Sequence, residues 1–343
     1  MANRTLKKDQ VVSLLNKVAA TYQLIAPVAD DSVILFKPLS SAEGVVFDYV
    51  NSVLPPKDYF FPQTEQIFKF STRNNQIVIN PPDPVKERVL FGIRPCDVQS
   101  ITAMDKVFDG EYKDTYYLDK RAKTTIIAVS CIEPLPTCFC TSVGGSPTSA
   151  PGADLLLTDV GNVYLVEVLS EKGEAFVQKF SEFFGDENGE GAKKAEVEKA
   201  VAEKFVRKTS LEGVKAKLDN MFEHPYWERL ARKCLGCAIC TYVCPTCHCF
   251  DICDFNSNGF EGERFRCWDS CMFADYTRMA GGHNPRPTKK ERVRNRFLHK
   301  LKYSWDRYGL GHCVGCGRCS RECPVNLGIY TVISDVKEVD ANV

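Results

Sequence analysis

The sequence lacks an excess of either charge, because Lys plus Arg and Asp plus Glu each total 44 in 343 residues. A balanced chain has no global field to hold a polyanion, so we expect no nucleic acid partner. It also lacks any run of roughly 20 apolar residues, which a membrane span requires, and it begins without the apolar core of a secretory signal. We therefore expect a cytoplasmic protein with no membrane span.

Recognisable nucleotide and catalytic motifs are also missing. No G-x-G-x-x-G follows a strand-like run, and there is no Walker loop. No nucleophile with a base and no paired carboxylates can be located. We therefore assign no catalytic residue and leave open whether the chain is an enzyme in its own right.

Cysteine is abundant, with 17 residues. In the reducing cytoplasm, thiols are poor candidates for disulfides and good candidates for metal ligands. Ordinary buried thiols would account for three or four cysteines, but not for their clustering along the chain. The cysteines are therefore the candidate functional residues.

The first half contains short β-type runs, at residues 32–36, 76–79 and 125–129, separated by Pro and Gly. A helix is expected before them, over about residues 7–21. Its apolar residues are spaced to form one stripe on a helix; they are Val11, Val12, Leu14, Leu15 and Val18. These patterns predict a mixed α/β domain without specifying its topology.

From Glu174 the pattern becomes helical, with helices expected over about 193–207 and 211–222. We place a domain boundary near residue 220. The predicted fold class is α+β, with an N-terminal mixed α/β domain over residues 1–220. A mainly helical, bacterial-ferredoxin-like dicluster domain with a long insertion follows over residues 221–343.

Two copies of one cysteine motif lie in this second domain. Residues 234–245 and 313–324 both read C-x2-C-x2-C-x3-C-P. Three thiolates of such a loop ligate one [4Fe-4S] cluster, and the fourth ligates the neighbouring cluster. The repeat therefore predicts two [4Fe-4S] clusters with crossed ligation.

The spacing assigns four ligands to each cluster. Cluster 1 takes Cys234, Cys237, Cys240 and Cys323, and cluster 2 takes Cys313, Cys316, Cys319 and Cys244. Structural zinc is the alternative, but zinc sites use pairs of C-x2-C, which fits the third cysteine and the Cys-Pro ending poorly. Small residues separate the ligands, where backbone N–H groups must approach cluster sulfurs; they are Gly236, Ala238, Gly315 and Gly317.

The insertion between the motifs carries five further thiols. They are Cys247, Cys249, Cys253, Cys267 and Cys271. A further iron-sulfur centre held by Cys247, Cys249 and Cys271 with either Cys253 or Cys267 is one interpretation. Redox-inert reduced thiols are the other. His248 and His283 are possible ligands, although each is more commonly an ordinary polar residue.

The N-terminal domain has a cysteine group of its own. It comprises Cys96, Cys131, Cys138 and Cys140, which follow strand-like runs and lie among Pro and Gly. Four thiols are enough for one more cluster. Buried small apolar side chains are the alternative, so the sequence allows one or two clusters beyond the pair.

Residues 286–302 form the one strongly basic stretch, expected to be helical. Its cations have three possible roles. They would meet an acidic partner, hydrogen-bond cluster sulfurs, or form a solvated face with Phe297 and Leu301 turned inward.

Over nearly its whole length the chain resembles a family of iron-sulfur subunits. This family includes the β subunit of cytoplasmic sulfhydrogenases, the A subunit of anaerobic sulfite reductase, and related subunits that feed heterodisulfide-reductase-type complexes. The resemblance rests on residues 92–97 (GIRPCD), 138–140 (CFC) with Ser142 and Gly144, 152–155 (GADL), 244–250 (CPTCHCF), 268–272 (WDSCM), 280–286 (AGGHNPR) and 292–300. Of the insertion cysteines, Cys247, Cys249 and Cys271 fall on family motif positions, whereas Cys253 and Cys267 do not.

The resemblance implies an electron relay. A partner subunit resembling ferredoxin-NADP reductase would carry FAD and bind NAD(P), and a catalytic oxidoreductase subunit of hydrogenase, sulfite reductase or heterodisulfide reductase type would lie at the other end. A flavin must connect a hydride donor to one-electron carriers, which agrees with the missing nucleotide motif. The alternatives are an autonomous reductase of sulfur, sulfite or a disulfide acting at an N-terminal cysteine or cluster, and a metal-held scaffold.

Overall fold

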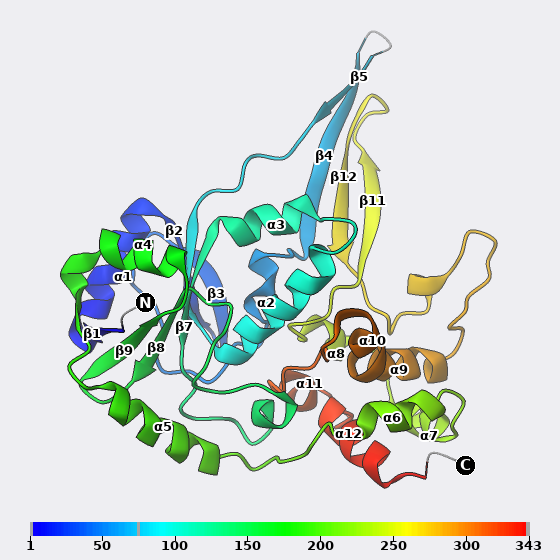
Figure 1. The fold of residues 1–343 in the computed structure, drawn as a ribbon. Coiled ribbons are helices and arrows are strands. Elements are labelled where there is room, and N and C mark those ends of the chain that lie inside the picture. The colour runs from blue at the N-terminus through cyan, green and yellow to red at the C-terminus, as the bar shows by residue number, and fades with distance from the viewer. Residues whose placement is uncertain (1–2, 74–75, 341–343) are drawn as a thin grey trace.

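A computed structural model of the chain describes residues 3–73 and 76–340 (Figure 1). The strands are β1 (Arg4–Lys7), β2 (Gln23–Asp30), β3 (Val33–Leu39), β4 (Thr64–Arg73), β5 (Gln76–Asn80), β6 (Arg88–Ile93), β7 (Thr124–Val129), β8 (Leu155–Asp159), β9 (Val163–Val168), β10 (Phe184–Asp186), β11 (Phe250–Asn256) and β12 (Glu261–Trp268). The helices are α1 (Val11–Thr21), α2 (Pro95–Phe108), α3 (Thr115–Ala122), α4 (Glu171–Lys179), α5 (Gly191–Glu203), α6 (Val214–Asn220), α7 (Tyr226–Lys233), α8 (Ile239–Tyr242), α9 (Lys289–Leu298), α10 (Ser304–Tyr308), α11 (Arg318–Arg321) and α12 (Ile329–Glu338). A π-helical turn, η6 (His299–Tyr303), joins α9 to α10.

The larger sheet has the strand order β10-β1-β9-β8-β7-β6-β2-β3. Its centre is parallel, because β2, β6, β7 and β8 pair in parallel register, and antiparallel strands complete both sides. Strand β6 is buried along its whole length, as expected for a strand covered on both faces. The predicted runs at 32–36, 76–79 and 125–129 are found as β3, β5 and β7.

Helices cover both faces of this sheet (Figure 1). Helices α1 and α4 pack in one apolar core with Val89 and Phe91 of β6, and helices α2 and α3 pack in another core with Leu90. This alternation follows from the period of two residues in a strand. The result is a three-layered N-terminal α/β region.

The predicted first helix is confirmed as α1, preceded by a short 3-10 turn. Four residues of its stripe are buried: Val11, Leu14, Leu15 and Val18. The expectation for Val12 is wrong, because its side chain is 46% exposed. Val12 lies one position along from Val11 and therefore about 100° round the helix.

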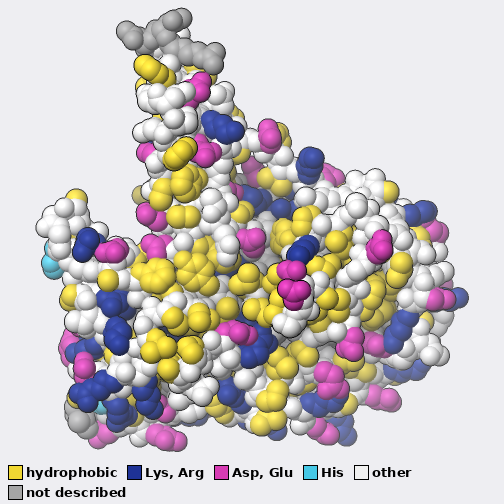
Figure 2. Space-filling view, turned by 180° about the vertical axis from the view of Figure 1, so that it is seen from behind, with side chains coloured by type: hydrophobic (Ala, Val, Ile, Leu, Met, Phe, Trp, Pro, Cys, Tyr) yellow, Lys and Arg dark blue, Asp and Glu magenta, His cyan; other side chains and the backbone are white. Residues whose placement is uncertain are grey.

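The smaller sheet joins segments that lie far apart in the sequence. Its order is β11-β12-β4-β5, and β4 from the first half pairs antiparallel with β12 from the insertion. Arg266 of β12 is 4% exposed and forms ion pairs with Glu65 of β4 and with Asp114. This sheet projects from the body of the molecule, and hydrophobic side chains are visible along it (Figures 1 and 2). The insertion is therefore partly a β-hairpin, which the sequence analysis did not predict.

The C-terminal region is mainly helical outside this hairpin, as expected. The predicted helices at 193–207 and 211–222 are found as α5 and α6, and the basic segment 286–302 contains α9 and most of η6. One apolar core unites α6, α7, α9 and α12. Among the described residues, no helix is long and apolar enough to cross a membrane.

The predicted boundary near residue 220 remains a prediction. The structure adds that contacts cross it, since β4 pairs with β12 and Asp97 forms an ion pair with Arg318. These contacts connect the sheet of the first half to the cysteine loops of the second.

Candidate functional site

The first cysteine-lined cavity lies between the two repeated motifs. Its thiols are Cys234, Cys237, Cys240 and Cys323, so the last cysteine of the second motif lies with the first three of the first. The backbone N–H of Gly236 donates to Cys234 Sγ at 3.3 Å, and that of Leu327 donates to Cys323 Sγ at 3.2 Å. Cys237 is exposed, so this cavity lies close to the surface.

The second cavity holds the reciprocal set of thiols. They are Cys244, Cys313, Cys316 and Cys319. Lys300 is buried, and its Nζ donates to Cys244 Sγ at 3.2 Å. Burial would lower the pKa of this ammonium, but the neighbouring sulfurs of Cys244 and Cys247 raise it above its usual value. A buried cation here balances the negative charge that thiolate ligands bring.

Arg296 lines both of these cavities. Its side chain is 3% exposed, and its Nη2 donates to the Cys240 carbonyl at 3.4 Å. Its Nε and Nη1 have no hydrogen-bond partner among the described residues. Buried donors are rarely left unsatisfied, and cluster sulfurs accept such hydrogen bonds. Four thiols in each cavity and an unsatisfied guanidinium between them therefore fit two anionic [4Fe-4S] clusters.

A third cavity contains all four N-terminal cysteines, namely Cys96, Cys131, Cys138 and Cys140. Cys96 follows β6 and Cys131 follows β7, and these strands are parallel neighbours. The carboxyl ends of parallel strands meet at one edge of a sheet, where ligands commonly bind. The loop after β7 then brings Cys138 and Cys140 back to this edge. Burial raises the pKa of Cys140 to about 12, so an uncompensated thiolate there is unfavourable.

The second and third cavities share a wall formed by Gly315 and Cys316. The Phe139 N–H donates to the Gly315 carbonyl at 2.8 Å. A side-chain carbon at Gly315 would lie 2.5 Å from the Cys140 backbone nitrogen, and the residue has a positive φ of 63°. Glycine is therefore required by close packing on the N-terminal loop as well as by its conformation. The three cavities follow one another through shared residues.

A buried ion pair fastens the second motif to the sheet edge. Arg318 Nη1 and Nη2 donate to the two carboxylate oxygens of Asp97 at 2.6 and 2.8 Å, and Nε donates to the Ser52 carbonyl at 2.7 Å. Arg318 is fully buried and Asp97 is 1% exposed. Asp97 follows Cys96 directly and Arg318 precedes Cys319, so this bidentate pair fixes the two cysteine sites relative to each other.

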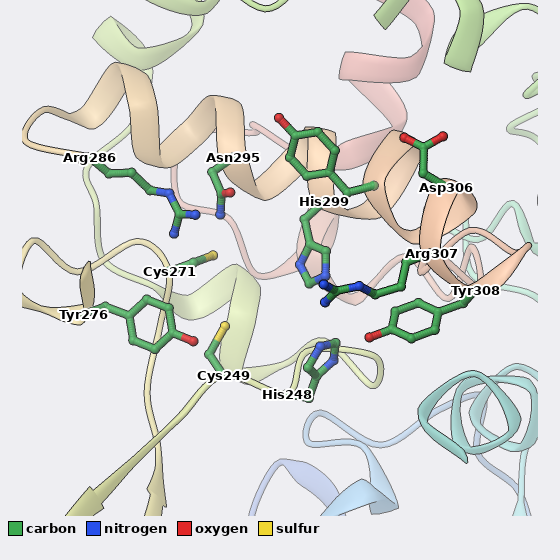
Figure 3. A pocket seen from close by; sticks show the side chains of 11 residues that line it. His248, Cys249, Cys271, Tyr276, Arg286, Asn295, His299, Asp306, Arg307 and Tyr308 are labelled. Atoms are coloured by element: carbon green, nitrogen blue, oxygen red, sulfur yellow. The ribbon is translucent and has the colours of Figure 1, made fainter. Parts of the chain in front are cut away.

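The five insertion thiols separate into three groups. Cys247 contacts Cys244 of the second cavity. Cys249 and Cys271 contact each other in a cavity of about 630 Å³ (Figure 3). A hydrogen bond from Cys271 lowers the pKa of Cys249 to about 6. Cys253 and Cys267 contact each other diagonally across the β11–β12 hairpin, where Cys253 lies opposite Phe265 and Cys267 lies opposite Asp251.

The basic segment is largely internal. Arg294, Arg296 and Lys300 are buried, as are Phe297 and Leu301. Lys302 pairs with Asp219. The role of hydrogen-bonding to cluster sulfurs therefore agrees with the positions of Arg296 and Lys300, and little of this segment is available as a solvated basic face.

Sequence analysis did not single out Arg318 or His312, and it included His299 only within the stretch 292–300 that carries the family resemblance. His312 has both ring nitrogens without a partner among the described residues, although its side chain is 1% exposed. Their only sequence signal was position, because Arg318 and His312 directly precede motif cysteines. His283, which the sequence analysis considered as a ligand, is exposed.

Comparison with known proteins agrees with this geometry. Residues 233–327 match the 4Fe-4S dicluster domain family. A sulfhydrogenase 2 subunit beta from Pyrococcus furiosus is 33% identical over 334 residues, which cover 97% of this chain and 98% of that protein. No solved structure matches the chain. The chain thus belongs to the sulfhydrogenase β subunit family, as an iron-sulfur electron-transfer protein with a 4Fe-4S dicluster domain.

Proposed function

We propose that this chain relays electrons through three [4Fe-4S] clusters between a flavin subunit that oxidises NAD(P)H and a catalytic oxidoreductase subunit. The observation that carries the proposal is the series of three cavities, each lined by four thiols and joined by shared residues. Such clusters accept and donate single electrons, with potentials set partly by hydrogen bonds to their sulfurs. The chain supplies the thiolate ligands, the hydrogen bonds to the cluster sulfurs and the distances between the clusters.

The proposed ligands are one cysteine set per cavity. Cluster 1 takes Cys234, Cys237, Cys240 and Cys323; cluster 2 takes Cys244, Cys313, Cys316 and Cys319; and the third takes Cys96, Cys131, Cys138 and Cys140. The crossed spacing of the two motifs supports the first two sets. Convergence at the edge of the parallel sheet supports the third.

The two ends of the series differ in exposure. At the first cavity Cys237 is exposed and Leu235 is 64% exposed, whereas Cys244 and Cys316 of the middle cavity are buried. Exposed apolar residues beside a redox centre support contact with a partner there. We propose that electrons cross to or from a partner at the first cavity.

Action within a complex is supported by two further observations. The related Pyrococcus protein is itself a hydrogenase subunit. The projecting sheet exposes large apolar side chains, with Ile77 at 72% and Phe255 at 57%, as surfaces that bind other proteins commonly do. We accordingly propose that the hydride chemistry occurs on a partner subunit that carries FAD.

Metal and sulfide counting tests the number of clusters. Anaerobically purified chain should contain about twelve irons and as many acid-labile sulfides. Cys138→Ser should remove about four irons and leave the paramagnetic resonance of two interacting clusters after reduction. Cys253→Ser is the matched control, and its iron content should not change. Eight irons in the unaltered chain would contradict the proposal of a third cluster. A colourless protein loaded with zinc would contradict all three clusters.

Reconstitution with the partner tests whether the chain receives its electrons from a flavin subunit. The chain alone should not oxidise NAD(P)H, whereas its clusters should become reduced when the flavin subunit that co-purifies with it is added. If the isolated chain, supplied with a chemical reductant, turned over sulfur, sulfite or a disulfide, the autonomous reductase would replace the relay. Cys240→Ser should interrupt electron transfer without preventing NAD(P)H binding to the flavin subunit.

A further inference from the structure

Three of the chain's five histidines converge beside the second cysteine cavity. They are His248 of the insertion, His299 of η6 and His312, which precedes the second motif. Their ring centroids lie 5.4 to 5.9 Å apart, and one nitrogen of each lies within 4.8 Å of the others. None of these histidines belongs to a proposed cluster ligand set.

The hydrogen bonds of these rings leave nitrogens free to bind a metal. His248 Nδ1 lies 3.0 Å from the Thr246 carbonyl, and donation from Nδ1 leaves the Nε2 lone pair available. Metal-bound histidines commonly make this second hydrogen bond, because it fixes the tautomer and the ring orientation. His312 is 1% exposed with both nitrogens unpartnered among the described residues. A buried imidazole without any partner needs an explanation, and coordination of a metal ion by this ring would provide one.

The backbone at this site is also unusual. His299 begins the π-helical turn that joins α9 to α10, and π-helical turns frequently occur at functional sites. Tyr308 stacks on the His312 ring at 5.3 Å between centroids, which fixes that ring. Burial lowers the pKa of His248 to about 4 and that of His299 to about 3, so these imidazoles are uncharged, as ligands must be.

We propose that His248, His299 and His312 bind one divalent first-row transition metal ion, separate from the iron-sulfur clusters. Imidazole nitrogen suits Fe²⁺ and Zn²⁺ as well as the other late metals of this row. Three protein ligands with at least one open position are typical of sites where a metal meets an exogenous ligand. Small rotations of the rings would bring the nitrogens to bonding distance, because χ2 of histidine is soft.

The surrounding cavity supports an open coordination position. His248 and His299 line the cavity of about 630 Å³, together with Arg286 and Arg307 (Figure 3). The cavity is lined by these two guanidinium groups and by one carboxylate, Asp306, and an excess of positive charge would favour water or a small anion as the remaining ligand. The Lys300 ammonium is close enough to lower the pKa of all three imidazoles, but it does not occupy the site, because it donates to Cys244, Thr246 and the His312 carbonyl.

Metal analysis of the full chain tests the proposal independently of electron transfer. Cluster iron equals acid-labile sulfide, so metal in excess of sulfide counts the proposed ion. Anaerobically purified chain, incubated with Co²⁺ and desalted, should retain about one equivalent of cobalt or hold one equivalent of Fe²⁺ or Zn²⁺ already. Where that metal is cobalt or zinc, X-ray absorption at its edge should show nitrogen and oxygen neighbours rather than sulfur.

Two variants locate the ion. His299→Ala should reduce the retained metal at least tenfold while the sulfide count stays unchanged, which shows that the cluster regions are folded. His283→Ala alters an exposed histidine outside the cavity and should retain the full equivalent. His248→Asn provides a second, smaller replacement should His299→Ala lose sulfide. No excess metal in the unaltered chain, or equal retention by His299→Ala and His283→Ala, would overturn the site.

Discussion

The two ferredoxin-type cavities and the N-terminal cavity collect their thiols in different ways. Each ferredoxin-type cavity takes three cysteines from seven consecutive residues and one from the other motif. The N-terminal cavity takes cysteines spread over 45 positions, from Cys96 to Cys140. The spacing of the cysteines in the sequence specifies the first arrangement. The second arrangement depends on which strands are neighbours in the sheet.

The difference shows how much of a ligand site a local sequence motif can determine. A tight loop with left-handed residues between its cysteines positions three thiols whatever lies around it. Ala238 and Gly317 hold equivalent places in the two loops and both have positive φ, of 64° and 75°. The N-terminal site instead requires β6 and β7 to be parallel neighbours. It should therefore be the more sensitive of the two to damage in the surrounding fold.

The largest effect is expected at the ion pair that joins the two regions, formed by Arg318 and Asp97. Arg318→Met leaves the Asp97 carboxylate buried without its partner, and breaking such a pair costs about 3–5 kcal/mol. The urea midpoint of the full chain, followed anaerobically by cluster absorbance, should fall accordingly. The double variant Arg318→Met with Asp97→Leu should recover part of the loss, since it leaves no charge unpaired.

The chain offers a matched control for that prediction. Arg264 and Asp254 also form a bidentate pair, through Nε and Nη2 at 2.7 Å, but both side chains are about 45% exposed. Arg264→Met should therefore shift the urea midpoint far less than Arg318→Met, because an exposed ion pair is screened by solvent. Equal shifts for Arg264→Met and Arg318→Met would contradict the view that burial makes the second pair essential.

The two cysteine loops can be compared through equivalent glycines. Gly236→Ala adds about 1–2 kcal/mol of strain from the left-handed backbone, and its new carbon meets only Lys289, at 3.9 Å. Gly315→Ala adds similar strain and also collides with the Cys140 backbone, which costs about 1–3 kcal/mol more.

Gly315→Ala should therefore lower the iron content of the N-terminal site as well as stability, whereas Gly236→Ala should leave that iron in place. Iron and sulfide counts on the two purified variants make the measurement. Loss of iron from the N-terminal site in both variants, or in neither, would show that the shared wall does not couple these cavities.

Arg296 should produce the smallest of these effects. A buried cation between two cavities stabilises the added electron on either side, so Arg296→Gln should lower both cluster potentials, by roughly 60 mV, equivalent to a tenfold change for a one-electron couple. Arg278→Gln, at an exposed side chain, should shift neither. Redox titration followed by paramagnetic resonance measures the cluster potentials of the two variants. An upward shift of the potentials in Arg296→Gln would contradict the role assigned to Arg296.

Several parts of this fold were predictable from the sequence because they rest on local pattern. The helix at α1 follows from apolar spacing, and β7 follows from a run of β-branched residues. The strand order was not predictable, because it depends on pairings between distant segments. The sequence analysis also missed the β11–β12 hairpin. In strand β11 (Phe250–Asn256) nearly every residue is exposed, so the strand needs no strong alternation of apolar and polar residues that would reveal it.

The candidate site divides in the same way. The cysteine sets of the two motifs could be written down from spacing, and the four N-terminal cysteines could be grouped only as plausible neighbours. Arg296 lies among several basic residues of similar appearance, and nothing local distinguishes it as the one between the cavities. The histidine cluster unites residues 64 positions apart, so only the tertiary structure brings it into view.

The pairing of β4 with β12 has a consequence for how this protein can be divided. Residues 64–71 and 261–267 pair along one ladder, so a protease that cut the connection between α5 and α6 would leave both fragments attached. A fragment beginning after that connection would expose the bare edge of β12, and unpaired edges promote aggregation. The dicluster region is therefore not a portable module that can be expressed or fused to another protein without the strands that accompany it.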